Sequence, residues 1–94
     1  MTDPTYAQLV ERVGERLYGR EWLKPMAHGL PAAQRTVERV AAAARDGGDY
    51  PAAKAWLEDM ARMVTERKEE LDALLDAIDD AKARRAAERR AREG

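Results

Sequence analysis

Four polar side chains that can hydrogen-bond to base edges and phosphates occur in one short stretch, LPAAQRTVERV, at residues 30–40. They are Gln34, Arg35, Thr36 and Arg39. Val37 and Val40, three positions apart, supply the apolar side of the same stretch. This spacing predicts an amphipathic helix that buries the valines and exposes the polar groups. A solvated helix with a Gln34–Glu38 pair is the simpler alternative.

Charge is distributed unevenly, although the formal net charge is only −1. Residues 11–45 hold seven bases and four acids, residues 51–81 hold four bases and nine acids, and residues 82–94 hold six bases and two acids. Such asymmetry favours a nucleic-acid ligand or charge-driven assembly. The basic C-terminal segment has another explanation, because the helix dipole favours basic residues near a helix C-terminus.

Composition excludes several classes of function. Helix-forming residues dominate, so we expect an all-α protein. With no cysteine and a single histidine, we expect no disulfide, no metal and no other cofactor. No nucleophile stands beside a base, so we expect no enzymatic activity and no small-molecule substrate. The chain lacks a long apolar run and a signal-peptide pattern, which fits a cytoplasmic location away from membranes.

Local signals divide the chain into helices. The first is predicted over residues 4–18, with Asp3 as its cap, Pro4 in its first turn and Gly19 at its end. A short helix should cover residues 23–29, and a third residues 32–45. The loop DGGDYP follows. Strong helix formers then continue from Pro51 almost to the C-terminus, so we expect two parts, residues 1–50 and 51–94.

The two short helices have the residue types of a helix-turn-helix unit. Such a unit needs a small residue in its first helix, apolar residues at the turn, and aliphatic residues facing inward from its second helix. The chain supplies Ala27, then Met26, Leu30 and Ala32, then Val37 and Val40. Trp22 and Trp56 are expected to anchor the core.

The stretch WLKPMAHGLPAAQRTVERV, residues 22–40, resembles the pattern W..PLA..LGVS.RTV.RW of small prokaryotic and phage helix-turn-helix regulators. It departs from that pattern at the turn and at the end of the second helix. Pro31 replaces the turn glycine, Ala33 the capping serine and Val40 the final tryptophan, and Glu38 adds an acid to the polar face.

The resemblance implies a DNA-binding protein and a role for each matching residue. Gln34 and Arg35 are expected to contact bases, and Arg39 a base or the backbone. Thr36 and Lys24 are candidates for phosphate contacts. Arg20 and Arg45 should add attraction that does not depend on sequence.

The C-terminal part contains a heptad pattern that predicts self-association. Its apolar members are expected to form an oligomerisation seam. They are Leu57, Met60, Val64, Leu71, Leu74 and Ile78, with Leu75 widening the stripe. Arg67 falls within the seam, either as a side chain that reaches out from a dimer interface or as an interruption of it.

Three functions are compatible with these features. The leading hypothesis is a sequence-specific bacterial or phage transcriptional regulator that binds double-stranded DNA as a dimer, because linked modules on two half-sites gain affinity. The second is a DNA-recognition oligomer similar to phage small terminase subunits, which also join a helix-turn-helix to oligomerisation helices. The third is a helical adaptor or inhibitor that binds another protein and no DNA.

Overall fold

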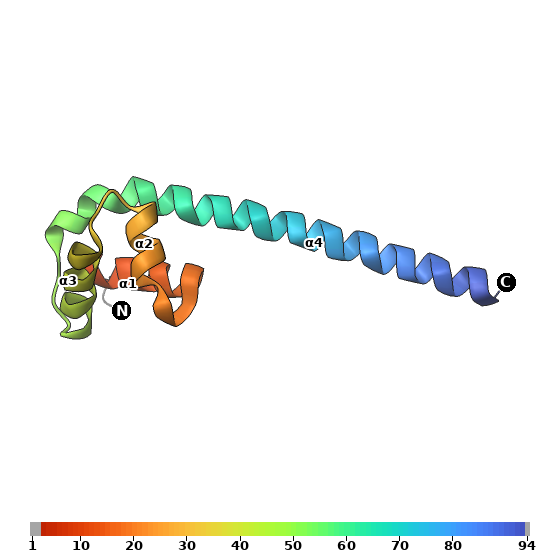
Figure 1. The fold of residues 1–94 in the computed structure, drawn as a ribbon, viewed down its shortest axis with the longest axis horizontal. Coiled ribbons are helices and arrows are strands. Elements are labelled where there is room, and N and C mark those ends of the chain that lie inside the picture. The colour runs from red at the N-terminus through yellow and green to blue at the C-terminus, as the bar shows by residue number, and fades with distance from the viewer. Residues whose placement is uncertain (1–2, 94) are drawn as a thin grey trace.

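The computed structural model describes residues 3–93, and every regular element in that range is a helix. The elements are α1 (Tyr6–Tyr18), the 3-10 helix η1 (Gly19–Glu21), α2 (Leu23–Gly29), α3 (Gln34–Arg45), the 3-10 helix η2 (Pro51–Trp56) and α4 (Leu57–Glu93). Figure 1 shows α1, α2 and α3 gathered into a bundle, from which α4 extends as a rod. The all-α prediction is therefore confirmed. Over the same residues, no helix has the length and apolarity that crossing a membrane requires.

The start of α1 differs from the prediction. Thr5, not Asp3, is the cap: its hydroxyl accepts a hydrogen bond from the Gln8 amide at 3.1 Å, and the Gln8 side chain accepts from the Thr5 amide at 3.0 Å. Thr5 is the cap because a reciprocal capping box requires a partner three residues later, and Gln8 is in that position. Asp3 and Pro4 therefore precede the helix. The predicted end is correct, since Gly19 has a φ of +79°.

The loop between α3 and η2 is fastened to the start of α1. The Thr5 hydroxyl donates to the Gly48 carbonyl at 3.1 Å. One carboxylate oxygen of Asp49 accepts from the Ala7 amide at 3.2 Å and from the Tyr50 amide at 2.7 Å. The bond from Ala7 satisfies an amide in the first turn of α1 that has no acceptor within the helix.

One hydrophobic core holds the bundle together, and it extends beyond the predicted boundary at residue 50. The buried side chains come from α1, α2, α3, η2 and the first turns of α4. They include Trp22, Met26, Val37, Val40, Trp56, Met60 and Met63. The two tryptophans are core anchors, as predicted. Residues 51–63 thus complete the bundle, because three short helices alone leave an apolar face uncovered.

Met60 was predicted to belong to the oligomerisation seam, and this is wrong. Its side chain is only 3% exposed and lies in the core of its own chain.

The rod begins later than the sequence suggested. The C-terminal half of the chain starts with the 3-10 turns of η2, so the α-helical rod starts at Leu57 and runs for 37 residues. Every residue from Lys68 to Glu93 is exposed. The rod accounts for the elongated dimensions of 64 × 30 × 22 Å.

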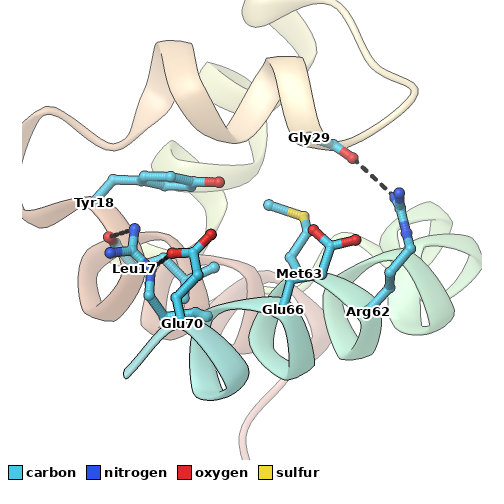
Figure 2. A pocket seen from close by; sticks show the side chains of 8 residues that line it. Leu17, Tyr18, Gly29, Arg62, Met63, Glu66 and Glu70 are labelled. Atoms are coloured by element: carbon cyan, nitrogen blue, oxygen red, sulfur yellow. Dashed lines mark hydrogen bonds and ion pairs between the residues drawn. The ribbon is translucent and has the colours of Figure 1, made fainter. Parts of the chain in front are cut away.

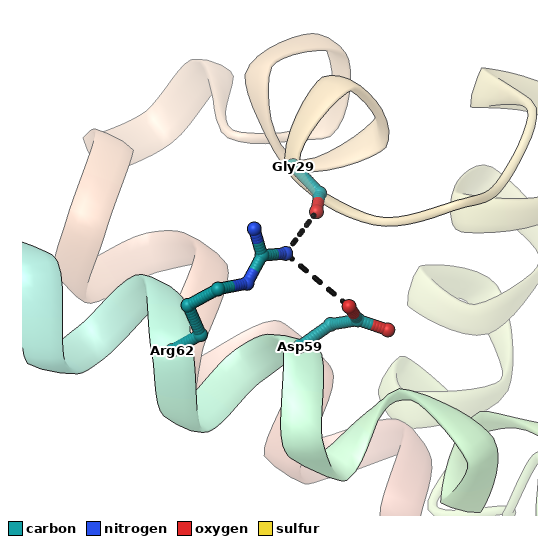
Figure 3. Close-up of polar contacts among 3 residues, drawn as sticks. All are labelled: Gly29, Asp59 and Arg62. Carbon is teal, nitrogen blue, oxygen red and sulfur yellow. Dashed lines mark hydrogen bonds and ion pairs between the residues drawn. The ribbon is translucent and has the colours of Figure 1, made fainter.

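Two arginines of α4 attach the rod to the bundle: Arg67 at the end of α1 and Arg62 at the end of α2. Figure 2 shows the hollow between these elements, about 250 Å³ in volume, with Arg62, Glu66 and Glu70 projecting from α4 toward Leu17 and Gly29. Arg62 donates to the Gly29 carbonyl at 3.4 Å and to the Asp59 carboxylate at 3.2 Å, as Figure 3 shows. Cations placed at the C-termini of helices are favoured by the helix dipole.

Candidate nucleic-acid interface

Helix α3 presents two different faces. Val37 and Val40 are fully buried, and Ala41 and Ala44 extend the same side into the core. At about 100° per residue, Arg35 and Arg39 fall near the centre of the opposite side. The side chains of both arginines are exposed. The fold therefore holds α3 firmly by one face and leaves the two arginines available to a ligand.

The turn before α3 brings α2 against it. Met26 and Leu30 are buried, and the Leu30 amide donates to the Met26 carbonyl at 2.9 Å, which closes α2. Leu30 itself is extended, with φ −98° and ψ 152°. Extended backbone is expected before a proline, so Pro31 shapes this turn where the related pattern has glycine.

Helix α3 begins two residues later than predicted. Ala33 is the N-cap, with φ −74° and ψ 149°, and Gln34 is the first helical residue. The backbone carbonyl of Ala33 accepts from the Thr36 amide at 2.9 Å, but alanine has no side-chain oxygen to serve as a cap. The start of the helix thus places Gln34 and Arg35 in its first turn, where a recognition helix contacts bases.

Four of the seven predicted DNA contacts line two separate hollows. Lys24 and Gln34 line a hollow of about 200 Å³ between α2 and the start of α3. Arg20 and Arg45 line a second hollow, beside Glu11 and Glu15 of α1. These two acids offset the positive potential of Arg20 and Arg45, so the strongest positive surface is expected nearer Arg35 and Arg39.

Glu38 modifies the polar face of α3. Its carboxylate accepts a hydrogen bond from the Gln34 amide nitrogen at 3.3 Å, and both side chains are exposed. The pair expected for a solvated helix is therefore present. The bond is long and exposed, so it costs little to break when Gln34 meets another partner. Thr36 lies on the other flank of α3 and is partly buried.

The sequence pattern missed the arginines that touch the rest of the bundle from α4. Arg67 was assigned to the seam, yet its side chain donates to the Leu17 carbonyl at 2.8 Å. Its guanidinium is thus held within its own chain, which favours the interruption of the seam over a role at a dimer interface. The signal that could have identified it is the charge itself, because a single arginine in an apolar row indicates a local acceptor.

The described residues offer no metal centre: within 3–93, no three His, Cys, Asp or Glu side chains are close enough to hold an ion together. No family model matches the chain, and no curated protein or solved structure is significantly similar to it.

Proposed function

We propose that this protein binds double-stranded DNA, reads its sequence with α3 and acts as a small transcriptional regulator. The observation that carries the proposal is the position of Arg35 and Arg39. Both are exposed on a helix whose opposite face is buried, directly after a short helix and a tight turn. Arginine is the side chain that most often makes specific contacts in the major groove, because it pairs with guanine through two hydrogen bonds.

The direction of the rod supports this assignment. Residues 66–80 of α4 carry seven acids and two bases, which DNA would repel. In Figure 1, α3 lies at one end of the molecule and the free end of α4 at the other. A duplex bound to α3 therefore meets the bundle and avoids most of the acidic segment.

Each predicted contact has a distinct role under this proposal. Gln34 and Arg35 reach base edges from the first turn of α3, and Arg39 follows one turn later. Thr36 and Lys24 bind phosphates on either side of the groove. Arg20 and Arg45 add weaker attraction, because Glu11 and Glu15 lie beside them.

Selection of bound duplexes from a random DNA pool, followed by a salt titration, tests the proposal. We expect an enriched sequence and an affinity that falls as salt rises, because binding releases counterions from the phosphates. A protein with no salt-dependent affinity for any duplex at low ionic strength is not a DNA-binding protein, and the adaptor hypothesis then takes precedence.

Two substitutions separate base contacts from phosphate contacts. Arg35→Ala should reduce the preference for the selected sequence by about 1–3 kcal/mol, whereas Lys24→Ala should weaken binding to all sequences alike. Arg84→Ala is the matched control, since it removes one positive charge from an exposed position far along the rod. Equal losses on all sequences from Arg35→Ala would limit that residue to a phosphate contact.

A further inference from the structure

An apolar groove runs between α1 and the first turns of α4. Two adjoining hollows form it, and Val13 and Val64 line both. Leu9 and Leu57 complete the first, which has a volume of about 410 Å³. Arg12 and Arg16 line the second. This α1/α4 groove is therefore an apolar channel with two basic side chains along one part of it.

Exposed apolar side chains continue the groove along the rod. At about 100° per residue, five of them fall within an arc of about 60° on the surface of α4. This rod stripe consists of Leu57, Val64, Leu71, Leu75 and Ile78, whose exposed fractions are 36%, 45%, 51%, 58% and 53%. The first two border the groove, and the last three lie beyond the end of α1. A row of exposed apolar side chains of this length is typical of a site of association.

We propose that a second copy of this chain covers the groove and the stripe together, with the two α4 helices antiparallel. Leu71, Leu75 and Ile78 of each copy then occupy the α1/α4 groove of the other. The result is a four-helix arrangement of two α1 and two α4 helices, in which both grooves are filled. Self-association through these surfaces does not depend on DNA binding.

Charge determines the choice between the two orientations. In a parallel pair, residues 66–80, with seven acids and two bases, would face the same segment of the other copy. Residues 82–93, with six bases and two acids, would likewise face themselves. An antiparallel pair separates most of these like charges and places the acidic segment against the groove that Arg12 and Arg16 line.

The length of the stripe also defines the alignment. When two stripes overlap fully in opposite directions, Ile78 faces Leu57 of the other copy and Leu71 faces Val64. The twofold axis then passes close to Lys68, whereas Lys82, on the stripe side of α4, lies far from Lys82 of the other copy. This difference is measurable, because a parallel pair would bring each residue on the stripe side of α4 beside its own counterpart.

Cysteine cross-linking tests the orientation directly, since the chain has no native cysteine. A disulfide requires Cα atoms about 4.4–6.8 Å apart. Under mild oxidation, Lys68→Cys should form a disulfide-linked dimer and Lys82→Cys should remain a monomer on a denaturing gel. Both positions are exposed, so neither change disturbs the core. Efficient cross-linking through Lys82→Cys would establish a parallel pair and overturn the proposal.

Sedimentation equilibrium tests the stoichiometry. The expected mass is twice the chain mass of 10.6 kDa.

Substitutions in the stripe test the interface itself. Leu71→Glu and Leu75→Glu should each raise the dimer dissociation constant by at least about thirty-fold, as loss of a central interface contact does. Ala73→Glu, on the opposite side of the rod, is the matched control. Unchanged far-ultraviolet circular dichroism of the dissociated variants verifies that the bundle remains folded. A monomeric wild-type protein, or a ring of many copies, contradicts the proposal.

Discussion

Arg67 donates a hydrogen bond from its guanidinium to the carbonyl oxygen of Leu17 across a distance of 2.8 Å. The bond joins α4 to the last turn of α1, which are separated by fifty positions along the chain. The carbonyl groups of a final helical turn have no amide partner within their helix. Arg67 therefore supplies both a donor and a positive charge at the negative end of the α1 dipole.

Loss of this contact should destabilise the bundle. We expect Arg67→Ala to lower the free energy of unfolding by about 1–2 kcal/mol, since the arginine side chain is partly exposed and water can replace some of the bond. Urea denaturation at one fixed protein concentration measures the change. Arg84→Ala, an arginine-to-alanine change on the exposed part of the rod, should have almost no effect. Equal effects of the two substitutions would show that the bond to Leu17 contributes nothing.

A series of glycine substitutions should rank by the space around each glycine. A methyl group added at Gly14 overlaps the indole ring of Trp22, which is buried in the core. We expect Gly14→Ala to cost about 1–3 kcal/mol of unfolding free energy. Gly29→Ala should cost less, because its methyl group meets the flexible end of Met63, 2.5 Å from Cε.

Gly48→Ala is the control for this series. A methyl group there meets only the Ala43 carbonyl oxygen, at 3.5 Å, which is an ordinary contact. Thermal unfolding of the three variants supplies the comparison. If Gly14→Ala were as stable as Gly48→Ala, Trp22 would not pack closely against Gly14 of α1.

Thr5 and Asp3 offer a test of which residue caps α1. Thr5→Ala should lower stability by about 0.5–2 kcal/mol, because the Gln8 amide loses its acceptor. The substitution also removes the bond from the Thr5 hydroxyl to the Gly48 carbonyl. Asp3→Ala should change stability little, since Asp3 is exposed and precedes the cap. A larger loss from Asp3→Ala in urea denaturation would restore Asp3 as the cap.

Glu38 should oppose DNA binding if α3 is the recognition helix. Glu38→Gln removes a negative charge from the exposed face of α3 and keeps the side-chain shape, so affinity for DNA should rise several-fold at low salt. Fluorescence anisotropy with a labelled duplex at two salt concentrations measures this. Glu69→Gln on the rod is the charge-matched control and should leave affinity unchanged. A similar gain from both substitutions would mean that only net charge matters.

Much of the fold could be predicted from local patterns. The spacing of Val37 and Val40 indicated the buried face of α3, and Gly19 indicated the end of α1, because both signals depend on residues close in sequence. The long helix also followed from local composition. These predictions agree with the structure because helix periodicity and termination require no knowledge of distant contacts.

Other outcomes depended on contacts between residues far apart in the chain. The heptad spacing placed Met60 and Arg67 in the same seam as Leu71, although α1 covers only the first turns of α4. Periodicity shows that a helix has an apolar side, but it does not show which part of that side the chain itself covers. The division between core and exposed stripe was therefore not available from spacing alone.

The helices, the polar face with Arg35 and Arg39, and the charge blocks along the rod could all be predicted from residue type and spacing. The packing of the helices, which spacing does not give, buries Met60 in the core and brings Arg67 to the end of α1. It also places Glu11 and Glu15 in one hollow with Arg20 and Arg45. The burial of a side chain and its hydrogen-bond partner depend on which helices pack against each other, and that packing is set by residues far apart in the sequence.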